Sequence, residues 1–227
     1  MAIEAEVVQF VAGALEQRAD PEKAVRMQAY MKTQMSFYGV QKPGRSEVLK
    51  ELRARFSIED AGTYESVVRA LWAQPHREEK YLAIAVARSA REFIGLDAIP
   101  LYRDLIVQGA WWDFVDEVAI RLVGAIWRQS RAELSPLMDQ WINDEDMWLR
   151  RTAIIGQITH KDETDEDRLF GYCSRRMDET EFFIRKAIGW ALREYSKTAP
   201  DAVRGFLKQN KDGLSGLSYR EGAKRLA

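Results

Sequence analysis

A carboxylate and an indole ring lie one helical turn apart in the stretch 110–118. Gly109 is a typical end residue for one helix, and we expect the next helix to begin at about Trp111. Trp112 and Asp116 are four residues apart, so on a helix they share one face. This pair can present a negative charge beside an aromatic surface, which is a combination that suits a cation.

A second segment, 181–190, is expected to face the first. Phe183, Ala187 and Trp190 are spaced by four and three residues, which again places them on one helical face. If the two faces line one cleft, the carboxylate of Asp116 lies between two indole rings. The rings attract a cation through their quadrupoles and the carboxylate neutralises it.

Each of these residues also has an ordinary structural explanation. A single tryptophan is more often a core residue than a ligand contact. Asp116 is harder to explain in this way, because a carboxylate on an otherwise apolar helix is costly to bury without a partner. It either pairs with a basic residue or faces a cleft. Arg150 and Arg151 are adjacent and point in different directions, so one can pair with an acid while the other faces the binding surface.

Composition excludes several functional classes. The formal net charge is −1, so global charge gives no support to nucleic-acid binding, although a basic face offset by an acidic run such as 162–167 would leave the same total. The only cysteine is Cys173, which precludes an internal disulfide, and the two histidines, His76 and His160, lie far apart. We expect no metal, no cofactor, no membrane span and a cytoplasmic location. Phosphate-binding Gly-rich loops and nucleophile motifs are absent from the sequence.

Apolar residues recur at helical spacing nearly throughout, which predicts an all-α fold in a single domain, 1–227. Trp148 to Ala153 and Phe183 to Ile188 share one pattern of aromatic, aliphatic, arginine, basic, small and apolar types, 35 residues apart. That interval is typical of helix-pair repeats, and it favours a HEAT- or armadillo-like solenoid with a concave surface over a closed bundle. The expected helices cover about 3–17, 21–34, 43–56, 63–74, 77–94, 100–108, 111–129, 134–142, 145–158 (capped by Asn143 or Asp144), 167–177, 180–198, 200–209 and 219–226.

Several strings of the sequence resemble the AlkD-type DNA alkylation repair glycosylases. The resemblance extends in order along nearly the whole chain, and the string from Phe182 to Tyr195 is the longest and most specific. The matching strings are 20–24, 29–32, 37–43, 111–116, 148–154 and 182–195.

The resemblance implies a helical-repeat fold with a concave DNA-binding groove and excision of cationic N3- and N7-alkylated purines from duplex DNA, without metal or cofactor. The family's catalytic aspartate falls on Asp116, and its two lesion-site tryptophans fall on Trp112 and Trp190. A DNA-contacting arginine falls on Arg151, and the aromatic residue near the lesion strand falls on Tyr30. We add Phe182, Phe183, Arg150, Gln41 and Lys186 as candidate DNA contacts. The loop 44–46 carries less basic character than the family leads us to expect.

The expected function is therefore a monofunctional, monomeric DNA glycosylase that acts on double-stranded DNA with alkylated purines. A non-catalytic repeat module that binds DNA or a protein partner needs the same surface but not Asp116. A protein-binding scaffold would not bind duplex DNA at moderate salt. If Arg151 contacts a phosphate, Arg151→Ala should weaken binding and flatten its salt dependence.

Overall fold

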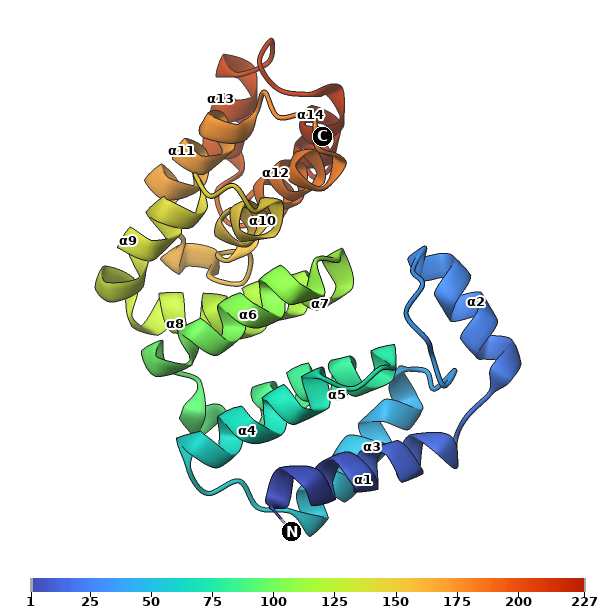
Figure 1. Cartoon of the computed structure of the whole chain (residues 1–227). Helices are drawn as coiled ribbons and strands as arrows, with labels where there is room; N and C mark the ends of the chain where they lie inside the picture. Colours follow the sequence, from blue (N-terminus) through green and yellow to red (C-terminus); the bar gives the residue numbers. More distant parts are fainter. Residues whose placement is uncertain (1, 227) are drawn as a thin grey trace. The chain divides into compact units, whose positions relative to one another are not determined.

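The computed structural model describes residues 2–226, and every regular element within them is a helix (Figure 1). This confirms the all-α prediction. The chain divides into two compact units, one ending at Ala98 and the other beginning at Ile99. The single-domain assignment stays a prediction, and the two units are described separately. No helix among residues 2–226 is both long and apolar enough to cross a membrane.

The first unit contains five α-helices and two short 3-10 helices. These are α1 (Ile3–Glu16), α2 (Pro21–Met31), α3 (Lys42–Arg55), α4 (Ala61–Trp72), α5 (Arg77–Ser89), η1 (Arg91–Phe93) and η2 (Leu96–Ala98). The predicted helix over 77–94 is too long, because the α-helical hydrogen bonds stop at Ser89 and a 3-10 turn follows.

Both units are built from pairs of successive helices that pack against each other. The elements of the second unit are α6 (Ile99–Gly109), α7 (Trp112–Val118), the π-helical η3 (Ala119–Val123), α8 (Gly124–Gln129), α9 (Arg131–Trp141), α10 (Met147–Ile155), η4 (Lys161–Glu163), α11 (Glu166–Arg176), α12 (Phe182–Tyr195), α13 (Pro200–Gln209) and α14 (Gly216–Ala223).

The start of α10 differs from the prediction. We expected a cap at Asn143 or Asp144, but the cap is Asp146, whose Oδ1 accepts the backbone N–H groups of Trp148 at 2.7 Å and Leu149 at 3.1 Å. A sequence with three candidate capping residues within 143–146, namely Asn143, Asp144 and Asp146, does not reveal which one turns toward the helix.

The second helix of each pair recurs with a constant period. Helices α3, α5, α7, α10 and α12 begin at residues 42, 77, 112, 147 and 182, so each begins 35 residues after the one before. The six-residue pattern noticed in the sequence lies at the start of α10 and of α12. With a constant period, residues 35 apart in the sequence occupy equivalent positions on successive helices, which is the arrangement of a helical-repeat protein.

A buried glutamate fixes the segment between α2 and α3. The carboxylate of Glu78, at the start of α5, accepts the backbone N–H groups of Tyr38 at 3.1 Å and of Gly39 and Val40 at 2.9 Å each. Gly39 has φ +88°, and a Cβ there would meet the carbonyl oxygen of Asp20 at 2.0 Å. The segment is thus held on α5 on one side and on the beginning of α2 on the other.

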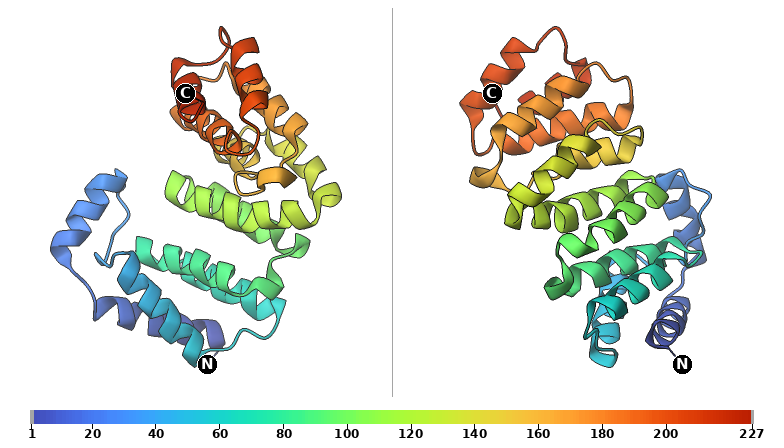
Figure 2. Two further views of the ribbon diagram at one scale, coloured as in Figure 1. Left: turned by 180° about the vertical axis from the view of Figure 1, so that it is seen from behind. Right: turned by 60° about the vertical axis from the view of Figure 1, so that its left-hand side comes forward.

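Helix α10 lies in the middle of the second unit, where it packs against α6, α7 and η3 and also against α12 (Figure 2). The close approach is possible because Gly124 and Gly156 meet without side chains. A Cβ at Gly124 would lie 2.3 Å from the carbonyl oxygen of Gly156. Nε2 of the buried His160 is 2.8 Å from the carbonyl oxygen of Gly124, which ties the segment after α10 to the same point.

In Gly124→Ala the added methyl group should push the continuous helix formed by α7, η3 and α8 away from α10. The second unit should be destabilised by about 1–3 kcal/mol. Thermal or urea unfolding measures this. Gly171→Ala on α11 is the matched control, because a Cβ there meets nothing within 4 Å and the change should stabilise by about 0.4–1 kcal/mol. Equal stability of the two variants would contradict this account of the helix contact.

Candidate active site

Asp116 and Arg151 form a buried ion pair between α7 and α10. Nε of Arg151 donates to Oδ1 of Asp116 at 2.7 Å, and Nη2 donates to Oδ2 at 2.8 Å. The side chain of Arg151 is 5% exposed and that of Asp116 is 14% exposed. The pair is bidentate, the geometry in which an arginine holds a carboxylate most firmly.

Arg151 is fixed from a third direction by α12. Its Nη1 donates to the backbone carbonyl of Phe183 at 2.5 Å, and its guanidinium carbon lies 6.0 Å from the centre of the Phe183 ring. The guanidinium therefore joins α7, α10 and α12. Its orientation, and with it the orientation of the Asp116 carboxylate, depends on all three helices.

An aromatic cluster covers this junction. The ring centre of Phe183 lies 5.5 Å from that of Trp111 and 5.0 Å from that of Trp148, and the two indoles lie 6.4 Å apart. Trp111 belongs to the first stretch that we singled out and Phe183 to the second, so the structure brings these two segments together. The rings exclude water and lower the local dielectric, which strengthens electrostatic interactions at the pair.

Burial changes the acidity of Asp116. Desolvation raises the pKa of this carboxyl above its usual value, while the hydrogen bonds and charge of Arg151 oppose the rise. Each carboxylate oxygen uses one lone pair for Arg151, so each keeps acceptor capacity toward a ligand or water. The site thus holds a carboxylate that is oriented and still partly accessible.

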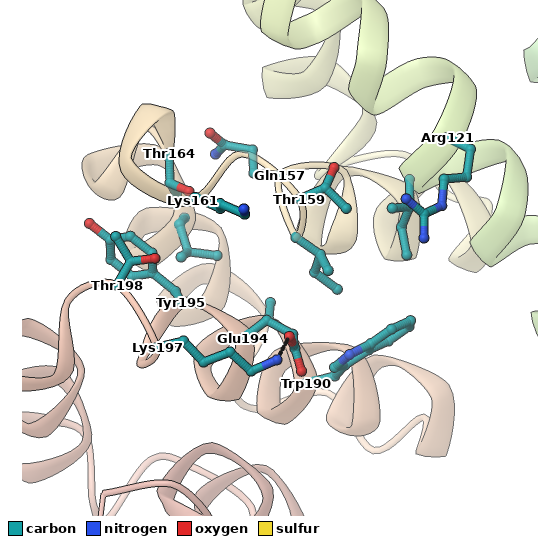
Figure 3. A pocket seen from close by; sticks show the side chains of 14 residues that line it. Arg121, Gln157, Thr159, Lys161, Thr164, Trp190, Glu194, Tyr195, Lys197 and Thr198 are labelled. Atoms are coloured by element: carbon teal, nitrogen blue, oxygen red, sulfur yellow. Dashed lines mark hydrogen bonds and ion pairs between the residues drawn. The ribbon is translucent and has the colours of Figure 1, made fainter.

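The two tryptophans predicted to flank Asp116 lie on different elements. Trp112 is the first residue of α7, one turn before Asp116, and it is half-buried. Trp190 lies on α12 and lines a cavity (Figure 3). Neither makes a ring–ring contact with another aromatic residue in the described part of the chain. The direct partner of the carboxylate is an arginine, so the expectation of a carboxylate held between two indoles omitted the group that orients it.

We expected one of the two adjacent arginines to pair with an acid and the other to face the binding surface. This is wrong, because both are paired with acids. Arg150 donates from Nε and Nη2 to the two carboxylate oxygens of Glu179 at 2.9 and 3.0 Å, and its side chain is 14% exposed. Lys186, another expected DNA contact, lies 3.4 Å from Glu221. Phe182 is 57% exposed at the beginning of α12 and is available to a partner.

The remaining expected contacts belong to the first unit. Tyr30, on α2, is 74% exposed, and Gln41 is the residue before α3. Both line a cavity of about 420 Å³ together with Arg26, Arg45 and Tyr81. These residues form an aromatic and basic surface of the kind that binds nucleic acid strands.

Sequence reasoning missed three residues of the second unit that bear on the site. Trp111 and Trp148 complete the aromatic cluster, and Arg121 enters the cavity beside Trp190. A signal for Trp148 was present, because it lies 35 residues before Phe183 in the repeated pattern. Within residues 2–226, no group of three or more His, Cys, Asp or Glu side chains could hold a metal ion.

Comparison with known proteins identifies the family. Residues 11–226 match the model of the DNA alkylation repair enzyme family. The chain belongs to this family. A comparison with curated proteins finds no match.

Solved structures agree with this assignment. The chain is similar to a structure described as a predicted DNA alkylation repair enzyme from Enterococcus faecalis, with 33% identity, coverage of 92% of this chain and 97% of that one, and a TM-score of 0.82. It also resembles AlkD2 from Streptococcus mutans (16% identity, 91% and 98% coverage, TM-score 0.62). A third similar structure is smu.31 from Streptococcus mutans UA159 (16% identity, 82% and 99% coverage, TM-score 0.59). The last two likenesses show the shared helical-repeat fold.

The buried position of Arg151 changes the expectation for Arg151→Ala. Removing the guanidinium leaves the Asp116 carboxylate without compensation, which should cost about 3–5 kcal/mol of stability and disorder the site. Because the guanidinium is already paired with groups of the protein, its loss should leave the salt dependence of DNA binding unchanged.

Arg150→Ala is the matched control, since it also removes a bidentate arginine from α10 but leaves Asp116 paired. The two variants are compared by thermal unfolding and by the slope of log affinity against log salt concentration. If the slope is flatter by about one for Arg151→Ala alone, Arg151 contacts a phosphate, as expected from the sequence.

Proposed function

We propose that this protein is a monofunctional DNA glycosylase that hydrolyses the N-glycosidic bond of cationic N3- and N7-alkylated purines in duplex DNA. The observation that supports this most directly is the Asp116 carboxylate, which is desolvated and oriented by Arg151 yet 14% exposed. Family membership supports a role in DNA alkylation repair. The substrate class and the reaction are those that the family resemblance implies, and the chemistry of the site is consistent with them.

The proposed reaction uses the charge that the lesion already carries. As the bond between C1′ and the purine nitrogen breaks, its electron pair moves to the purine, which leaves as a neutral base. Positive charge then develops on the deoxyribose, as in the oxocarbenium-like transition states of glycoside hydrolysis. Asp116 would stabilise that charge, because an oriented carboxylate in a water-poor site acts without reorganising.

Water completes the reaction at C1′. Its oxygen forms the new bond and its proton passes to Asp116 or to solvent. In this scheme Trp112 and Trp190 present π faces to the cationic sugar, each worth about 0.5–2 kcal/mol. No amine nucleophile is required, so the proposed product is an abasic site in an unbroken strand.

The alternative is a non-catalytic helical-repeat module that binds DNA or a protein partner. One observation favours it: Asp116 has a complete ion-pair partner, so its presence is explained by structure alone. The two proposals differ in whether the free lone pairs of Asp116 act on a substrate.

Asp116→Asn separates them. The amide oxygen accepts one of the two hydrogen bonds from Arg151 but the negative charge is lost, so excision should fall by about 10²-fold or more, while duplex binding by the folded variant should change little. The measurement is single-turnover release of 7-methylguanine and 3-methyladenine from methylated duplex DNA. Asp139→Asn is the control, because Asp139 pairs with Arg168 elsewhere in the second unit and should not affect excision. Release that is independent of Asp116, or absent in wild type with binding retained, would favour the non-catalytic module.

The excision rate should also depend on pH through Asp116. The ionised carboxylate is the active form, so the rate falls as the pH drops through its pKa. Since burial raises that pKa, the loss should begin at a higher pH than for an ordinary aspartate. Single-turnover rates from pH 4 to 8, corrected for spontaneous depurination, test this. A rate that stays flat down to the range of an exposed aspartate would show that this carboxylate does not govern the reaction.

A further inference from the structure

A cavity of about 590 Å³ lies beside Trp190 in the second unit (Figure 3). Its walls come from η3, from the segment after α10, from α11 and from α12 with the residues that follow it. The apolar part of the lining includes Ile120, Ile158, Leu169 and Trp190. The cavity therefore shares one residue with the proposed catalytic group, and Ile120 follows Asp116 by four residues.

Two cations line this cavity without a partner. The side chains of Arg121 and Lys161 form no ion pair or hydrogen bond within residues 2–226. The other arginines near the site are neutralised: Arg150 by Glu179 and Arg151 by Asp116. The one carboxylate in the wall, Glu194, is paired with Lys197. The lining thus includes two cations that have no direct ion-pair partner among residues 2–226.

The π-helical segment explains how Arg121 comes to this wall. The backbone N–H of Gly124 donates to the carbonyl of Ala119, five residues earlier, so this turn holds one residue more than an α-helical turn. In an uninterrupted helix only Ile120 would stack over Asp116, and Arg121 would point about 100° away. In the widened turn Ile120 and Arg121 both line the cavity. Such segments are often found at functional sites.

Hydroxyl groups add hydrogen-bonding capacity to the same cavity. Thr159, Thr164 and Thr198 all line the cavity (Figure 3). Threonine hydroxyls donate to phosphate oxygens, and unpaired arginine and lysine side chains are the usual partners of a phosphodiester. An apolar floor with a basic, hydroxyl-bearing wall has the chemistry of a deoxyribose phosphate.

We propose that this cavity binds the sugar–phosphate backbone next to the lesion, with Arg121 and Lys161 on the phosphate and the apolar floor against the sugar. This proposal rests on the proposed function, because it places the reacting nucleotide on one side of Trp190 and the flanking nucleotide on the other. A bound flanking phosphate fixes the position of the strand. The unused lone pairs of the Asp116 carboxylate then point at C1′ rather than at another part of the nucleotide.

The test combines protein variants with neutralised DNA. Arg121→Gln, Lys161→Gln and the double variant are compared with a Lys208→Gln, Lys211→Gln double variant, which makes the same charge change at exposed positions outside the cavity. Binding is measured on a duplex with a stable abasic analogue, at several salt concentrations. Each cavity variant should raise Kd by about tenfold and flatten the salt slope by about one.

The decisive measurement uses duplexes in which a single phosphate flanking the analogue is replaced by an uncharged methylphosphonate. At one position, neutralisation should weaken wild-type binding but have no further effect on the cavity variants. Additive losses at every flanking position, or losses equal to those of the control variant, would overturn the assignment of a phosphate to this cavity.

Because binding is measured without base excision, the outcome is independent of the glycosylase proposal. Non-additive losses together with no base release would retain the phosphate site and reject the reaction. Base release together with additive losses would retain the reaction and reject the phosphate site.

Discussion

The arrangement of the second unit depends on one buried ion pair, that of Asp116 with Arg151. Removing two charges from water is expensive, and the cost is recovered only when geometry is good and the remaining hydrogen-bonding groups are satisfied. Here the pair is bidentate, and the guanidinium also donates to the carbonyl of Phe183. The helices α7, α10 and α12 must therefore keep their spacing, or an uncompensated charge is left in a water-poor environment.

The 35-residue period explains why these two residues meet. Asp116 and Arg151 are the fifth residues of α7 and α10, and Lys186 and Glu221 follow at the same interval. Equivalent positions of adjacent repeats face the same direction, so an acid in one repeat lies beside the base in the next. Lys186 and Glu221 also form an ion pair, at 3.4 Å. The row of equivalent positions thus reads acid, base, base, acid, and the acid at each end pairs with the base next to it, which at Asp116 yields an oriented carboxylate.

Much of this could be predicted from the sequence, and the limits are physical. Helical periodicity and the echo between Trp148 and Phe183 predict the fold class and the period, because both depend on residue types at regular spacing. The partner of Asp116 was not predictable in the same way. Arg150 and Arg151 are neighbours of one type, and only the rotation of α10, set by packing, decides which of them faces α7.

The cavity beside Trp190 lay beyond sequence reasoning for a different reason. Its basic wall depends on the π-helical turn at 119–123, and no residue type in that segment distinguishes it from a continuous helix. Lys161, the first residue of the 3-10 helix η4, reaches the cavity with φ +55°. A sequence pattern of period 3.6 predicts regular helices. It therefore cannot predict a site that forms where a helix departs from regular geometry.

The pairing of Asp116 with a cation also bears on how it could act on a positively charged transition state. An unpaired carboxylate in this setting would take up a proton readily, because desolvation disfavours its charged form. Arg151 supports the ionised form and fixes its plane, while one lone pair on each oxygen stays unused. The arginine reduces the net charge of the site, yet it supplies a carboxylate that is already desolvated and aligned. For a leaving group that is itself cationic, orientation matters more than net charge, because the base needs no protonation and only the sugar has to be stabilised.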